Sequence, residues 1–128
     1  MSDYGYTREL NLTFHDAIKR VEEELMKEGF GVLTRIDVRS ALKKKLNEDF
    51  EDYMILGACN PLFAFKALKA EKEIGLLLPC NIIIYSEDKK TFVSAINPSA
   101  IMSVVGHGKI EEIASEVRSK LNKVIDNL

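Results

Sequence analysis

A polar turn between two apolar, β-branched runs is the feature of this sequence that most constrains its fold. Residues 80–85 and 91–96 each have the composition of a strand, and the residues between them, Ser86-Glu87-Asp88-Lys89-Lys90, are too few for a crossover helix. The pattern therefore predicts a hairpin of two antiparallel strands. A parallel doubly wound sheet, which the alternation of strands and helices before residue 85 would allow, is disfavoured at this end of the sheet.

Hydrophobic periodicity predicts three further strands, at residues 3–10, 30–38 and 53–59. It also predicts helices from Phe14 to a stop at Gly29, over 40–48, from Pro61 to near Gly75, in a short segment after Asn97-Pro98, and over 109–128. Together these elements predict an α+β fold, with a mainly antiparallel five-stranded sheet and helices packed on one face.

Length and charge place the chain among ordinary globular domains. Its 128 residues predict a single domain spanning residues 1–128, and 46% of them are hydrophobic. Eighteen Lys and Arg oppose twenty Asp and Glu, so the net charge is −2, and no nucleic-acid partner is expected. The basic group Arg35, Arg39 and 43–45 is followed at once by acidic residues, which favours a solvated face of mixed charge.

The composition also bears on the compartment. Two cysteines are too few for a disulfide scaffold, so a reducing, cytoplasmic location is expected, and no signal peptide is recognisable. The uncharged stretch 91–108 is broken by Asn97-Pro98 and by the glycines around His107. No membrane partner is therefore expected.

Two motif groups are similar to a known family. They are the run Leu56-Gly57-Ala58-Cys59-Asn60-Pro61, then Ala67-Leu68, and then the run Glu73-Ile74-Gly75-Leu76-Leu77-Leu78-Pro79-Cys80-Asn81. With the order of helices and strands, they resemble the domain of unknown function 302 family over nearly the whole chain. The resemblance implies a small prokaryotic protein, a TATA-box-binding-protein-like α+β fold and a dimer. It implies no established activity, and the name of the fold does not imply DNA binding.

Cys59 and Cys80 are the first candidates for chemistry. Cys59 ends one strand just before a helix, where the positive end of the helix dipole could lower the pKa of its thiol. Cys80 begins the next strand, so the two cysteines share one sheet edge if the strands are antiparallel and lie at opposite ends if they are parallel. The alternative is that both are buried packing residues, as free cysteines often are.

The strand-Asn-Pro-helix device occurs twice, at Asn60-Pro61 and Asn97-Pro98. Both asparagines are expected to cap helices, and in the antiparallel arrangement both helix N-termini would point toward one region that favours an anion. Plain capping is the simpler interpretation.

The histidines give weaker signals. His15 is expected on the solvent side of its helix, and His107, between two glycines, has no acidic residue at a diagnostic spacing. The cysteine and histidine spacings fit no zinc pattern, and no phosphate-binding or nucleophile motif occurs, so no metal, cofactor or catalytic residue is assigned.

The sequence thus predicts a cytosolic binding or assembly module with an apolar, anion-tolerant site for a small ligand at one sheet edge. The candidate ligand-binding residues are Cys59, Asn60, Cys80 and Asn97. The alternative is a thiol-based redox or metal-binding protein that uses Cys59 and Cys80. A homodimer is also expected, because the apolar residues from Pro98 to Val105 exceed what one short helix needs for its core contacts.

Overall fold

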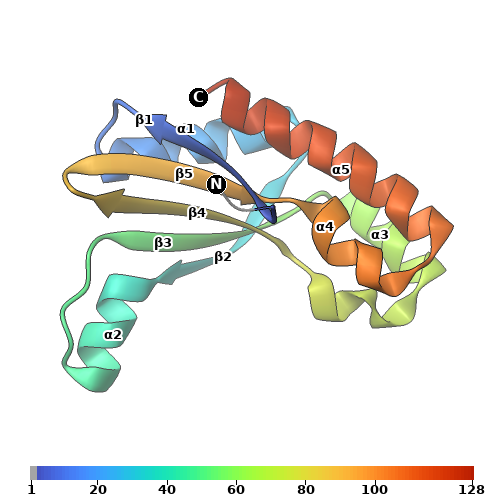
Figure 1. Ribbon diagram of the computed structural model, residues 1–128, viewed down its shortest axis with the longest axis horizontal. Coiled ribbons are helices and arrows are strands. Elements are labelled where there is room, and N and C mark those ends of the chain that lie inside the picture. Colours follow the sequence, from blue (N-terminus) through green and yellow to red (C-terminus); the bar gives the residue numbers. More distant parts are fainter. Residues whose placement is uncertain (1–2) are drawn as a thin grey trace.

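The centre of the molecule is a five-stranded sheet with the order β1-β5-β4-β3-β2, seen in a computed structural model that describes residues 3–128 (Figure 1). Every pair of neighbouring strands is antiparallel. The predicted antiparallel sheet is confirmed, and the parallel alternative is wrong; the likeness to the TATA-box-binding protein stays a prediction. The strands are β1 (Gly5–Leu10), β2 (Gly31–Asp37), β3 (Tyr53–Cys59), β4 (Cys80–Glu87) and β5 (Lys90–Ile96).

The β4–β5 hairpin turns more tightly than the polar run suggested. Glu87 pairs with Lys90, so Asp88 and Lys89 alone form the turn, with φ of 51° and 65°. Two consecutive left-handed residues give the turn whose twist matches that of a hairpin. The remaining polar residues of the run extend the two strands.

Two long helices cover one face of the sheet. They are α1 (Phe14–Lys27), which contacts β4 and β5, and α5 (Gly108–Asp126), which contacts β5 and β1. Figure 1 shows α3 (Pro61–Ala70) and α4 (Pro98–Met102) at one end of the sheet and α2 (Val38–Leu46) at the opposite end. Short 3-10 helices follow α3 and α4, as η1 (Lys72–Leu77) and η2 (Ser103–Val105).

The core lies between the sheet and α1, α3, α4 and α5. Along β4 the side chains alternate, with Cys80, Ile82 and Ile84 buried against the helices. The side chains of Ile83 and Tyr85 are half-buried on the other face. There the ring of Tyr85 stacks between those of Tyr53 and Phe92, at centroid distances of 5.6 and 5.3 Å.

Arg8 fastens the edge strand β1 to the end of α5. Its guanidinium donates hydrogen bonds to the backbone carbonyls of Ile125, Asp126 and Leu128, at 3.1, 3.0 and 3.0 Å. These carbonyls lie at and just after the C-terminal end of α5, where the negative end of the helix dipole favours a cation. The contact fixes the C-terminal helix across the sheet.

Two predicted helices have different bounds. The helix expected to run to near Gly75 ends at Ala70, because Glu71 is extended (φ −149°) and its carboxylate accepts a hydrogen bond from the amide of Glu73. This break brings Ile74 of η1 into the core. The helix expected over 40–48 spans 38–46, because Asp37 caps it by accepting from the amide of Ser40.

The apolar surface expected between Pro98 and Val105 is largely absent. Pro98 and Met102 are buried, Ile101 and Val105 are half-buried, and Val104 is the one exposed residue of these five. The sequence-based reason for a dimer at this place was therefore wrong, since α4 uses these side chains to cover the core. In residues 3–128, the helices are too short or too polar to cross a bilayer.

Candidate functional site

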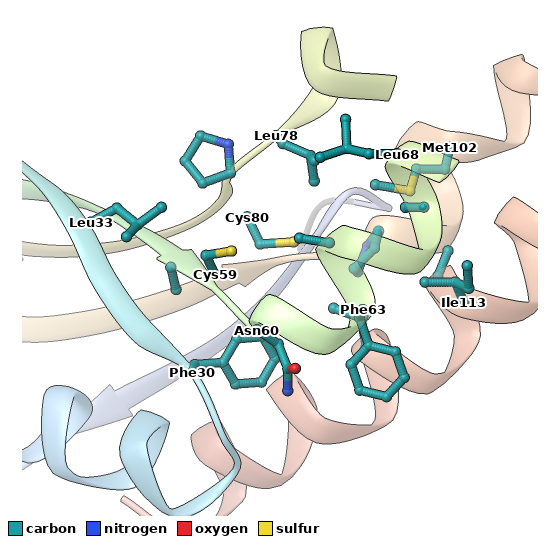
Figure 2. A pocket seen from close by; sticks show the side chains of 17 residues that line it. Phe30, Leu33, Cys59, Asn60, Phe63, Leu68, Leu78, Cys80, Met102 and Ile113 are labelled. Atoms are coloured by element: carbon teal, nitrogen blue, oxygen red, sulfur yellow. The ribbon is translucent and has the colours of Figure 1, made fainter. Parts of the chain in front are cut away.

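An apolar cavity of about 260 Å³ opens where β3 ends and β4 begins (Figure 2). Its walls come from the adjacent ends of β2, β3 and β4 and from α3, α4 and α5. They are formed by Phe30, Leu33, Ala58, Cys59, Asn60, Phe63, Ala64, Ala67, Leu68, Leu78, Pro79, Cys80, Pro98, Met102, Ile113, Ala114 and Val117. None of these side chains carries a charge at neutral pH when the thiols are protonated, so the site is built for apolar contact.

Both cysteines line this cavity. Cys80 pairs with Ala58 across the antiparallel β3–β4 ladder. Cys59, at the end of β3, and Cys80, at the start of β4, therefore lie at the same end of the sheet. This confirms the placement expected for antiparallel strands. Figure 2 shows both side chains directed toward the space beside α3.

The two thiols are not activated. Burial raises the pKa of Cys80 to about 11, with a smaller contribution from the nearby Cys59. Burial also raises the pKa of Cys59, which is opposite to the lowering expected from the dipole of α3. Both thiols are therefore protonated at neutral pH and act as weak hydrogen-bond donors.

Asn60 lines the cavity but does not cap α3 with its side chain. Its Nδ2 donates to the carbonyl oxygen of Glu28 at 3.3 Å, which ties the start of α3 to the end of α1. Gly29 makes room for this contact, because a Cβ there would lie 3.1 Å from Nδ2 and φ is +85°. The capping role predicted for this side chain was wrong, since its amide bonds the backbone at the end of α1 instead.

Asn97 does act as a cap. Its Oδ1 accepts from the amide of Ser99 at 3.1 Å, and its Nδ2 donates to the carbonyl oxygen of Asp3 at 3.3 Å. It does not line the cavity, although its neighbour Pro98 does. The fold thus brings together three of the four candidate residues, namely Cys59, Asn60 and Cys80.

The helical walls of the cavity were not identified from the sequence. Phe63 and Ala67 of α3 and Ile113, Ala114 and Val117 of α5 belong to amphipathic stripes that would look the same in any packed core. The mouth was not identified either. Leu33 of β2 and Leu68 of α3 line the cavity while 67% and 43% exposed, so they mark where it meets solvent.

The histidines have structural places. Nδ1 of His107 accepts from the amide of Lys109 at 3.1 Å and so caps α5, while His15 is exposed with its ring edge against Phe14. Within residues 3–128 no three His, Cys, Asp or Glu side chains gather as a metal site would require.

Three residues of the basic group form ion pairs. Arg35 pairs with Glu22 at 2.7 Å, Arg39 with Asp52 at 2.9 Å and Lys43 with Asp49 at 3.1 Å. The expected mixing of charge signs on this surface is confirmed.

Comparison with known proteins gives a family and similar solved structures. The model of the family described as domain of unknown function DUF302 matches residues 6–128. The crystal structure of an uncharacterised conserved protein DUF302 from Bacillus stearothermophilus is similar, with a TM-score of 0.92, 30% sequence identity and coverage of 98% of each chain. No curated protein matches the chain.

Proposed function

Since the chain belongs to the DUF302 family, which is defined by a domain of unknown function, we propose from its cavity that it is a binding module for a small apolar molecule. The observation that carries the proposal is the uncharged cavity between the sheet edge and α3, which opens to solvent at Leu33 and Leu68.

The size of the cavity sets the size of the ligand. Its volume of about 260 Å³ exceeds the roughly 150 Å³ of an engineered apolar cavity that stays dry and binds benzene. It lies just below the range of about 300 to 1,000 Å³ that is usual for ligand pockets. A ligand with one ring or a short branched chain would fit inside it, and a larger one would extend through the opening beside Leu33 and Leu68.

The polar groups set the polarity of the ligand. The side-chain donors at the cavity are the two weak thiols and the amide of Asn60, which uses one of its two N–H groups to bond the carbonyl oxygen of Glu28. An acceptor atom such as a carbonyl or ether oxygen could lie beside the thiols. A full anion would have no cationic side chain among the lining residues, so we narrow the anion-tolerant site expected from the sequence to an uncharged ligand.

A fluorescent probe tests the proposal. N-phenyl-1-naphthylamine is neutral and brightens in apolar surroundings, and the parent protein should bind it with saturation at one equivalent. Ala67→Leu and Ala64→Leu place extra methyl groups in the cavity and should abolish the saturable signal, whereas Ala100→Leu on the exposed side of α4 should leave it unchanged. Ala64 is half-buried, so its variant tests the cavity even if Ala67→Leu does not fold. A signal that survives both cavity variants would overturn the proposal.

A thiol function is the second candidate. It is favoured by the placement of Cys59 and Cys80 on one cavity and disfavoured by the raised pKa of both thiols. Labelling of native protein with N-ethylmaleimide near neutral pH, compared for parent, Cys59→Ser and Cys80→Ser, decides between them. Fast labelling of either cysteine before unfolding would support thiol chemistry.

We further propose that the module forms a homodimer through the uncovered face of its sheet. This face carries a continuous set of half-buried and exposed apolar side chains, namely Ile36, Tyr53, Ile55, Ile83, Tyr85 and Phe92. Apolar residues concentrated on one face favour association over exposure to water. A two-fold dimer would bury the same face of both copies.

A further inference from the structure

The edge strand β2 contains one residue more than its partner strand pairs with. Val32 pairs with Ala58 of β3. Thr34 pairs with Gly57, the residue next to Ala58, so Leu33 is the extra residue of a β-bulge. Bulges are frequent at sheet edges and beside binding sites, where they change the direction of a side chain. This bulge has both settings, since β2 is the last strand of the sheet and Leu33 lines the cavity.

A close contact between β2 and β3 holds this register. The hydroxyl oxygen of Thr34 occupies the space that a side chain at position 57 would fill, so the contact requires Gly57. Cγ of Pro79 lies 2.8 Å from where a Cβ of residue 57 would stand, and Pro79 also lines the cavity. The position of Leu33 therefore follows from the packing of its neighbour Thr34.

Leu33 lies at the opening of the cavity together with Leu68 of α3. These two leucines are the exposed members of the lining, at 67% and 43%, whereas the other lining residues are buried or half-buried. Figure 2 shows them on opposite sides of Cys59 and Cys80. A ligand that reaches from the cavity to solvent would therefore run beside two apolar side chains.

The volume of the cavity and the exposure of Leu33 favour a ligand that is longer than the cavity. At about 260 Å³, the cavity is smaller than most ligand pockets. A ligand confined inside it would leave most of the Leu33 side chain in water. A ligand whose outer part extends through the opening would bury that apolar surface, which favours binding.

We propose that Leu33 is a specificity-determining residue that selects elongated, uncharged apolar molecules. The inner part of such a molecule would fill the cavity, and its outer part would lie against Leu33 and Leu68. A polar end would lie beyond the two leucines, in water. The inference rests on the proposed function, because it concerns a ligand of the same cavity.

Packing at the rim is the competing explanation for Leu33, and the bulge provides a variant that separates the two. A residue that only packs there would affect short and long ligands alike. Val32 and Thr34 already pair with consecutive residues of β3, so deletion of Leu33 would leave a regular ladder. Because neither neighbour changes its partner or its face, the deletion removes the leucine without a shift of register.

Two primary alcohols test the proposal. Hexan-1-ol and decan-1-ol are uncharged and differ only in chain length, and each should displace N-phenyl-1-naphthylamine from the parent. Decan-1-ol should bind the parent more tightly, by up to about fourfold for each fully buried methylene. Leu33→Ala and the deletion of Leu33 should lower the affinity for decan-1-ol on the order of fourfold more than that for hexan-1-ol. Leu46→Ala, at a leucine of α2 that is 64% exposed, should change neither affinity.

A cavity variant separates this inference from the proposed function. Ala64→Leu should weaken the binding of both alcohols, because it reduces the volume that either can fill. Equal losses for the two alcohols in Leu33→Ala, or a parent whose affinity does not rise from hexan-1-ol to decan-1-ol, would overturn the inference alone. A parent that binds neither the fluorescent probe nor the alcohols would overturn the proposed function and this inference with it.

Discussion

Gly57 is a position where one added carbon atom would disturb both the sheet and the site. A Cβ there would lie 2.2 Å from Oγ1 of Thr34 and 2.8 Å from Cγ of Pro79. The Thr34 hydroxyl can rotate away, but the ring of Pro79 is held at the rim of the cavity. Gly57→Ala should therefore lower the free energy of unfolding by about 1–3 kcal/mol, as overpacking does.

Gly31 supplies the matched control, because it is also in a strand and a Cβ there meets nothing within 4 Å. Gly31→Ala should change the free energy of unfolding little or raise it slightly. Urea denaturation of both variants checks the difference. Equal free energies of unfolding for the two variants would contradict the prediction, because Pro79 and Thr34 would then move aside without any loss of stability.

Cys80 should make stability depend on pH in the alkaline range. Burial raises the pKa of its thiol to about 11, whereas the thiol of an unfolded chain titrates near ~8.5. The folded state therefore keeps a proton that the unfolded state releases, so the contribution of Cys80 is complete below about pH 8.5 and is lost as the pH rises toward 11. Parent and Cys80→Ala, unfolded in urea at a series of pH values, should converge in stability over this window.

A constant difference between parent and Cys80→Ala across the same window would show that the thiol titrates normally in the folded protein. From the sequence, the two cysteines were expected at one end of the sheet only if β3 and β4 are antiparallel, because the hairpin fixes the direction of β5 relative to β4 and not that of β3. The pKa of each thiol could not be predicted, because burial depends on how α3 and α5 close over the edge.

The two Asn-Pro helix starts look alike in sequence, but their asparagine side chains make different hydrogen bonds. Asn97 accepts a hydrogen bond as a helix cap, whereas Asn60 donates one to Glu28. Asp caps a helix as well as Asn but cannot donate. Asn97→Asp keeps the cap and loses only the exposed hydrogen bond to the carbonyl of Asp3, so it should lower the free energy of unfolding by less than about 1 kcal/mol. Asn60→Asp loses the part-buried hydrogen bond to Glu28 and should lower it by about 1–3 kcal/mol.

Thermal unfolding of the two Asp variants at neutral pH is the check, and similar effects at both positions would show that Asn60 acts as a cap after all.

Local sequence rules predicted both helix starts correctly, because Pro at the first turn is compatible with either role. The partner of each amide depends on which distant segment lies beside it. Likewise, residues 71–75 favour a helix locally, and burial of Ile74 decided otherwise.

At the scale of the whole molecule, the uncovered sheet face should determine the oligomeric state. Ile83 is half-buried on that face, away from the helices and the cavity. Ile83→Glu would bring two carboxylates together in a two-fold interface, so the dimer should become a monomer with the fold retained. Sedimentation velocity at micromolar concentration checks this, with Leu46→Glu on α2 as the control.

A parent that is already a monomer, or an Ile83→Glu variant that remains a dimer, would contradict this interface. The set of five strands and two long helices was sufficient to predict helices on one face of the sheet, but the consecutive apolar residues 82–85 did not show which side chains would face them. The place of β1 beside β5 and the fastening of α5 by Arg8 were beyond the sequence, because both contacts join segments near opposite ends of the chain. The cavity is a product of that same long-range packing.

Titration with toluene, followed by the methyl resonances of isotopically labelled protein, tests the central claim most directly. Binding in the cavity predicts saturable shifts of the methyl groups of Ala58, Ala67, Met102, Ile113 and Ala114, all of which line it. Ile36 and Ile83 on the open sheet face should not shift. Shifts confined to the open face, or no saturable shift of the cavity methyl groups, would contradict a ligand site at the Cys59–Cys80 edge.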